Sequence, residues 1–143
     1  MRSAVCSVAR VRYIDLIGRP WRRGGSDPKT GIDCWGVVEF MYRRAGLYVP
    51  KLLPDVARES CKVDVAHADP VAAHNGFRIV QWPFEAVDDL DIVASTDERD
   101  RVHVGVVVDC DRLTVLSARP RVGVYSARID KIRGVEGVYR AEL

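Results

Sequence analysis

A loop rich in glycine and proline covers residues 18–32 and stops at Asp33, where a segment with helical periodicity begins. The apolar residues behind Cys34 recur at the spacing of one helix face: Val37, Val38, Met41 and Ala45. This pattern predicts a helix over residues 34–45 with Asp33 as its N-cap. Gly46 is suited to the position just past the helix end, where a left-handed backbone is common.

Cys34 therefore occupies the first turn of the predicted helix. The unpaired amides and the dipole at a helix start favour negative charge on a neighbouring side chain. A thiol placed there loses its proton more easily than a free one. A cysteine nucleophile also needs a base within hydrogen-bond reach and a group that orients the base.

Length and composition indicate one domain spanning residues 1–143, with 48% hydrophobic residues to build a core. The 22 basic and 20 acidic residues leave a net charge of +2, so we expect no nucleic-acid partner. No segment approaches the ~20 apolar residues that span a bilayer, so we expect no membrane span. The first 12 residues lack the apolar stretch of a secretory signal, so we expect synthesis in the cytoplasm without a signal peptide.

The four cysteines are scattered and form no Cys-x-x-Cys pair: Cys6, Cys34, Cys61 and Cys110. This spacing predicts neither a zinc site nor a dithiol redox site, and a domain of this size does not need disulfide bonds. We therefore expect Cys6, Cys61 and Cys110 to be core or incidental cysteines. We also expect no metal ion and no organic cofactor.

The rest of the chain predicts helices first and strands afterwards. Apolar spacing predicts a first amphipathic helix over about residues 3–16 and a short helix around residues 53–60. Beyond residue 75, short runs rich in β-branched residues alternate with turns, which is typical of an antiparallel sheet. The predicted strands cover residues 79–82, 90–94, 102–108, 113–117, 122–127 and 135–140. The fold class is α+β.

Three histidines are candidates for the base. His67 and His74 lie in the irregular middle segment, at a spacing that matches no common metal motif. His103 lies on the predicted strand 102–108, where a half-buried histidine with satisfied hydrogen bonds is the ordinary outcome. It becomes a candidate base because a strand histidine some 70 residues after a helix-start cysteine follows the papain-like order of elements.

The same residues resemble the signature of the NlpC family of papain-like cell-wall cysteine peptidases. Its Gly-Thr-Pro-Tyr, Gly-Gly and Asp-Cys-Ser-Gly-Leu-Val motifs are similar to Gly18-Arg19-Pro20-Trp21, Gly24-Gly25 and Asp33-Cys34-Trp35-Gly36-Val37-Val38. Residues 88–93 resemble its Gly-Asp-Leu-Val strand, and His103-Val104-Gly105-Val106 resembles its His-Val-Gly-Ile motif. Leu116-Ser117-Ala118 stands where the family has Leu-His-Ala. The likeness spans about residues 7–140.

The resemblance implies a papain-like fold in which N-terminal helices, including the nucleophile helix, pack on an antiparallel sheet. It implies Cys34 as nucleophile and His103 as general base and later acid. The expected reaction is hydrolysis of an amide in peptidoglycan stem peptides, next to D-glutamate, through a thioester intermediate.

Tryptophan after the cysteine looks most like the phage and prophage tail branch of the family. With no signal peptide expected, we expect the protein to reach the cell wall as part of a phage-tail-like assembly. Other tail proteins are then its partners, beside the peptidoglycan peptide.

Four positions carry the remaining expectations. Ser117 takes the third catalytic position, and its hydroxyl is able to accept from an imidazole N–H although it is short and uncharged. Trp21 replaces the family's tyrosine, either as an oxyanion donor or as a packed aromatic. Trp35 either narrows the substrate pocket or serves as a stacking wall. Asp33 keeps the family residue that helps hold the substrate's amino end, although helix capping alone explains it.

Two other functions fit the same sequence. One is a structural or wall-binding tail module that kept the fold while its activity decayed, which Ser117 makes plausible. The other is a different reaction at Cys34, as in an acyltransferase or amidase.

Overall fold

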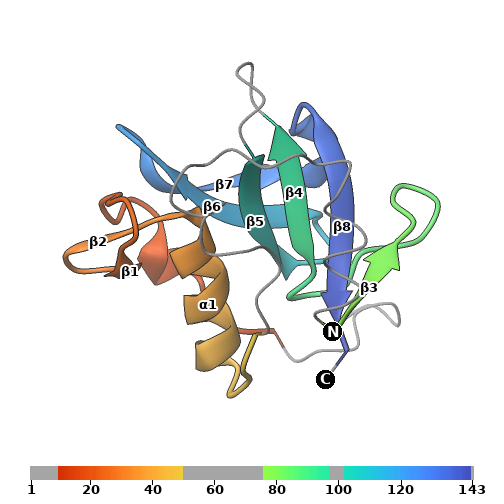
Figure 1. Ribbon diagram of the computed structural model, residues 1–143, viewed down its shortest axis with the longest axis horizontal. Helices are drawn as coiled ribbons and strands as arrows, with labels where there is room; N and C mark the ends of the chain where they lie inside the picture. Colours follow the sequence, from red (N-terminus) through yellow and green to blue (C-terminus); the bar gives the residue numbers. More distant parts are fainter. Residues whose placement is uncertain (1–9, 50–75, 97–101, 143) are drawn as a thin grey trace.

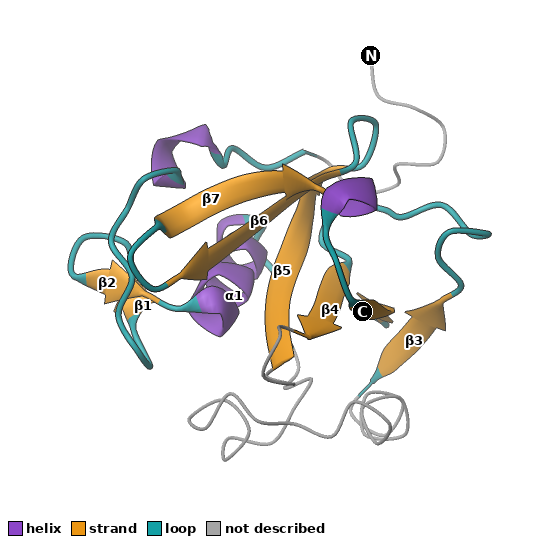
Figure 2. Ribbon diagram, turned by 90° about the horizontal axis from the view of Figure 1, so that it is seen from above, coloured by secondary structure: helices purple, strands orange, loops and turns teal. Residues whose placement is uncertain are grey.

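The computed structural model describes residues 10–49, 76–96 and 102–142 of the 143-residue chain. Within these ranges the α-helix α1 covers Cys34–Arg44 and lies against the central strands of a six-stranded antiparallel sheet (Figures 1 and 2). The strands are β3 (Phe77–Val80), β4 (Ile92–Thr96), β5 (Val102–Asp109), β6 (Thr114–Arg119), β7 (Gly123–Arg128) and β8 (Val135–Ala141). Their order across the sheet is β3-β8-β4-β5-β6-β7.

The helix predicted over residues 34–45 and the six predicted strands are confirmed to within about two residues at their ends. The α+β class is confirmed with them. Asp33 caps α1, because its carboxylate accepts the Gly36 N–H at 2.6 Å. Gly46 takes a left-handed φ of 77° just past the helix end, as expected. Arg43 and Arg44 lie in the last turn, where positive charge complements the helix dipole.

The sheet is buried on both faces. On β5, Val104 and Val106 face the cluster that contains the apolar face of α1. Val107, one residue on, faces a second cluster with Val93 and Ile129, the first residue of the 3₁₀ turn η3 (Ile129–Lys131). Burial on both faces explains why β5 is a continuous apolar run in the sequence and does not alternate. Side chains alternate between the two faces of a strand, and His103 is four residues before Val107. His103 therefore lies on the same face of the sheet as Val107.

The first predicted helix is wrong where the structure describes it. Residues 10–13 are not helical, and only the 3₁₀ turn η1 forms, at Ile14–Leu16. The Arg10 guanidinium donates to Asp109 at 2.9 Å and Asp111 at 3.2 Å, which holds this segment at the end of β5. A helix this short has little stability of its own, so such tertiary contacts prevail over periodicity. The helix predicted around residues 53–60 lies outside the described residues, as do His67 and His74.

Two further features differ from the sequence-based expectations. The loop before Cys34 contains a small hairpin of β1 (Ser26–Asp27) and β2 (Gly31–Ile32), whose two-residue strands are too short to show a period. Cys110 is a core cysteine, as one of the two expected alternatives had it, because it is buried in the second cluster. It is also disulfide-bonded, which was not expected. A large core removes the need for a disulfide but does not prevent one. Cys6 and Cys61 lie outside the described residues.

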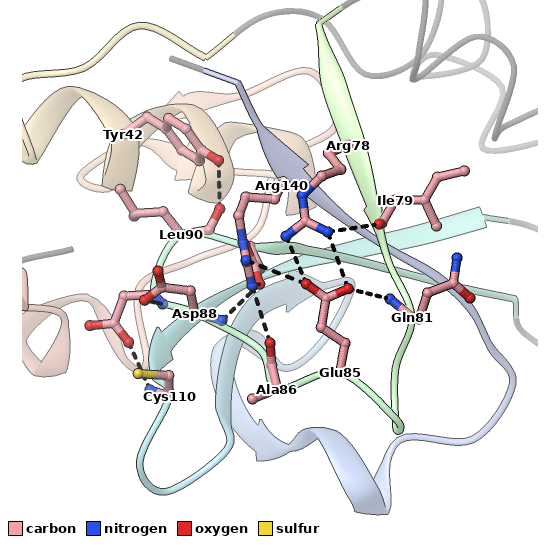
Figure 3. Close-up of polar contacts among 12 residues, drawn as sticks. Tyr42, Arg78, Ile79, Gln81, Glu85, Ala86, Asp88, Leu90, Cys110 and Arg140 are labelled. Atoms are coloured by element: carbon pink, nitrogen blue, oxygen red, sulfur yellow. Dashed lines mark hydrogen bonds and ion pairs between the residues drawn. The ribbon is translucent and has the colours of Figure 1, made fainter. Parts of the chain in front are cut away.

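A polar network ties β8 to the segment before β4 (Figure 3). The Arg140 guanidinium donates to both carboxylate oxygens of Asp91 at 2.9 Å and to the Ala86 carbonyl at 3.1 Å. Asp91 is only 1% exposed, so this ion pair replaces water around a buried charge. The Tyr42 hydroxyl donates to the Leu90 carbonyl at 2.5 Å and joins α1 to the same segment. None of the described helices has the length and apolar character needed to cross a membrane.

Candidate active site

Cys34 is the first residue of α1, and its half-buried thiol takes no part in a disulfide. Both carboxylate oxygens of Asp33 organise its surroundings, since Oδ1 accepts from Gly36 N–H and Oδ2 from Gly24 N–H at 3.0 Å. The capping function expected of Asp33 is thus confirmed. Its contact with substrate stays a prediction.

The loop before α1 is fastened to the edge strand β7. The Gly18 N–H donates to the Val124 carbonyl, and the Val124 N–H donates to the Arg19 carbonyl, each at 2.9 Å. The loop then closes on itself, because the Ile32 N–H donates to the Pro20 carbonyl at 3.0 Å. These bonds hold the start of α1 beside the β6–β7 edge of the sheet, where Figure 1 shows the helix entering.

Two glycines of the motif are required by close packing. A Cβ at Gly36 would lie 2.4 Å from the Gly25 carbonyl oxygen, and a Cβ at Gly25 would lie 2.2 Å from the Gly31 carbonyl oxygen. The Gly25 carbonyl accepts the Asp33 N–H at 3.1 Å, so the loop backbone packs directly on the first turn of α1. Side chains at these positions would push the loop away from Cys34.

His103 is half-buried on β5, and its Nε2 meets two hydroxyl groups from the neighbouring strands. The Ser117 Oγ on β6 and the Tyr125 hydroxyl on β7 each lie 2.9 Å from Nε2. Ser117 and Tyr125 are direct partners in the β6–β7 register. Gly105 follows His103 on the same face, and a Cβ there would lie 2.5 Å from Val115 Cγ1, so its lack of a side chain keeps this face open beside the ring. The three polar residues line a small hollow together with Ser95.

The hydroxyl of Ser117 determines which ring nitrogen carries hydrogen. Its only hydrogen is donated to the Val104 carbonyl at 2.5 Å, so Oγ turns a lone pair toward His103. Two lone pairs at 2.9 Å would repel, and the contact is a hydrogen bond only if Nε2 is protonated. Nδ1 is therefore the nitrogen that takes up and returns a proton.

Tyr125 also connects His103 with the cysteine. Burial raises the pKa of the Tyr125 hydroxyl, and the Arg119 guanidinium opposes part of that rise. A negative charge on Cys34 raises the same pKa, so the sulfur lies within electrostatic range of this hydroxyl. Ser117 and Tyr125 thus contact His103 directly, while Cys34 acts electrostatically on Tyr125. Tyr125 is the member of this group that sequence reasoning missed.

Trp21 and Trp35 are half-buried and pack against the core cluster of α1. This placement accounts for Trp21 as a packed aromatic, while its role at an oxyanion and the pocket role of Trp35 stay predictions. Asp109, at the other end of β5 from His103, pairs with Arg10. Within the described ranges, no three His, Cys, Asp or Glu side chains gather in a way that would hold a metal ion.

No family model matches the sequence. A segment of 36 residues, 25% of this chain, is 47% identical to the murein DD-endopeptidase MepH of Escherichia coli K12, covering 13% of that protein. A segment of 34 residues, 24% of this chain, is 44% identical to the bifunctional muramidase/DL-endopeptidase CwlT of Bacillus subtilis 168, covering 10% of it. The matches thus span only a small part of each relative.

The solved structure of the NlpC/p60 domain of the peptidoglycan hydrolase SagA is similar over 90% of this chain and 91% of that one. The TM-score is 0.51 and the sequence identity is 16%. The likeness covers α1 and the sheet together, because so little of either chain is left out. The protein therefore has the NlpC/p60-like α+β fold, with one helix packed on a six-stranded antiparallel sheet.

Proposed function

We propose that this protein is an NlpC/p60-type cysteine peptidase that hydrolyses an amide bond in peptidoglycan stem peptides. The observation that carries the proposal is a thiol at the start of α1, in this fold, within electrostatic range of the hydroxyl that bonds His103. The printed activities of the two relatives, both wall endopeptidases in name, support the same substrate class.

In the proposed reaction, His103 takes the Cys34 proton on Nδ1, and the thiolate attacks the amide carbonyl carbon. The tetrahedral oxyanion accepts a hydrogen bond from the Cys34 backbone N–H at the start of α1. Collapse of this intermediate breaks the C–N bond, and the imidazolium returns its proton to the leaving amine.

The enzyme is left with a thioester on Cys34. His103 then removes a proton from water, which attacks the thioester carbonyl and releases the acid and the thiol. Throughout both halves, Nε2–H stays bonded to Ser117, so Ser117 acts as a positioning residue for the base.

The position of the cut bond and the route to the wall are finer proposals. Cleavage next to D-glutamate rests on the family resemblance, and delivery by a phage-tail-like assembly rests on the Asp-Cys-Trp-Gly variant alone. We propose both as working hypotheses for the substrate mixture and the partners to test.

Digestion of purified wall peptides tests the function directly. Because the two relatives carry DD- and DL-endopeptidase names, the substrate should contain both cross-linked and monomeric stem peptides. We expect new fragments by mass spectrometry, and the masses of the two fragments from one cut should add up to the mass of the parent peptide plus one water. The matched control is the same protein after iodoacetamide treatment that modifies Cys34, which should give none.

Three other outcomes would redirect the proposal. Equal products from the treated and untreated protein would mean that Cys34 is not the nucleophile. Binding without any new fragment would favour a structural or wall-binding module. Products joined to an added amine in place of water would favour acyl transfer.

A further inference from the structure

We infer that Tyr125 is a positioning residue for His103, so that two hydroxyl groups on neighbouring strands together hold the imidazole. The inference rests on the proposed function, because it assigns a role to the far side of the proposed base. Its basis is the contact between the Tyr125 hydroxyl and Nε2, at the same 2.9 Å as the Ser117 contact.

The hydrogen-bond balance gives Tyr125 a defined role. The Ser117 hydrogen is committed to the Val104 carbonyl, which leaves Nε2–H as the donor toward Ser117 Oγ. The Tyr125 oxygen lies 2.9 Å from the same Nε2–H and so meets it with a lone pair. Both hydroxyl oxygens are then acceptors for the single hydrogen on Nε2.

This arrangement favours the charged form of the ring. An imidazolium donates from both nitrogens, and its hydrogen bonds are stronger than those of a neutral ring. Two acceptors at Nε2 therefore lower the free energy of the imidazolium and of the thiolate that forms with it. A short serine hydroxyl alone supplies one such acceptor, and Tyr125 supplies the second.

The ring of Tyr125 is held in place by its neighbours. It lies parallel to the His103 ring, with an interplanar angle of 5° and 6.2 Å between centroids. The Arg119 guanidinium lies 4.8 Å from the centre of the Tyr125 ring. Cys34 from α1 and Arg119 from β6 act electrostatically on Tyr125. Burial raises the pKa of Tyr125 above its ordinary value, so it remains a neutral phenol near neutral pH.

Tyr125→Phe tests the inference, because it keeps the ring, its stacking and its cation–π contact and removes only the hydroxyl. The readout is the rate of Cys34 alkylation by iodoacetamide against pH, followed on the Cys34 peptide by mass spectrometry. We expect the high-pH step, at which the imidazolium of the ion pair loses its proton, to move down by about one pH unit, the scale of one charge-assisted hydrogen bond. The low-pH step, in which the thiol loses its proton beside an imidazolium that is already charged, should not move. The matched control is Tyr42→Phe, which removes another buried tyrosine hydroxyl bond, to Leu90, and should leave the high-pH step in place.

A high-pH step in Tyr125→Phe that stays within about 0.2 pH units of wild type would overturn the role of Tyr125 and leave the proposed function standing. If the wild type has no low-pH step, the proposed function fails, and NMR of the His103 ring, identified by its loss in His103→Gln, decides about Tyr125. We then expect a slowly exchanging Nε2–H in the wild type that Tyr125→Phe exposes to rapid exchange. An unchanged Nε2–H in that variant would overturn the inference.

Discussion

Replacing Cys34 with alanine should lower the rate of wall-peptide hydrolysis by on the order of 10⁶-fold, the scale of nucleophile removal in the serine-protease template. The sulfur forms the bond to the substrate carbonyl, and no other described side chain in this corner replaces it. Alanine keeps the first turn of α1 intact, because it is the best helix former and Asp33 continues to cap the helix. The loss should therefore appear in kcat, with peptide binding and thermal stability close to wild type.

The measurement is the turnover rate of one purified stem peptide, with its dissociation constant measured by calorimetry on the same sample. Cys34→Ser is the companion variant, since its hydroxyl has the right place but ionises far less readily. It should also be inactive. Residual activity within tenfold of wild type in Cys34→Ala would contradict the assignment of the nucleophile.

Replacing Arg140 with alanine should have the largest effect on stability, a loss of about 3–5 kcal/mol in the free energy of unfolding at pH 7. The variant leaves the Asp91 carboxylate, 1% exposed, without the cation that bonds both of its oxygens. The matched control is Arg128→Ala, which breaks a similar two-bond pair with Asp130 in which the side chains are 56% and 42% exposed. It should cost far less than Arg140→Ala, because water screens that pair.

The loss of stability in Arg140→Ala should depend on pH. Burial raises the pKa of Asp91 above its usual value even with Arg140 beside it, so ionisation of Asp91 disfavours the folded state. Without Arg140 the ionised form is disfavoured further. The loss should be full at neutral pH and should shrink as the pH falls and Asp91 takes up its proton. Equal losses for Arg140→Ala and Arg128→Ala in urea denaturation would contradict the role of burial.

Much of the fold was predictable from local patterns. The start of α1 follows from an N-cap residue, Asp33, directly before an apolar period, and β5 follows from a long β-branched run. The helix and the strand depend on residues close together in the sequence, where periodicity and capping have direct physical meaning. Ser117 was predictable as a neighbour of His103 only through the resemblance of both motifs to those of one family.

The missed features depend on register and on distant partners. Tyr125 reaches His103 because it pairs with Ser117 across β6 and β7, and that pairing depends on the turn that joins these strands. Residues 10–13 follow the pairing of Arg10 with Asp109, 99 positions away, and not their own periodicity. The sequence signal for Tyr125 was an aromatic residue two positions after Gly123 on a predicted strand. Its position on the strand indicates which face of the sheet the side chain lies on, but not which residue it contacts on the neighbouring strand.

The most direct test of the thiolate–imidazolium pair is the rate of Cys34 alkylation at pH 6 in three samples: the folded wild type, the wild type unfolded in urea, and folded His103→Ala. We expect the folded wild type to react at least about tenfold faster than the unfolded chain, because a helix-start thiol paired with an imidazole is already ionised at that pH. His103→Ala should lose most of that advantage while remaining folded. Equal rates at Cys34 in the folded and unfolded wild type would contradict an activated nucleophile in this protein.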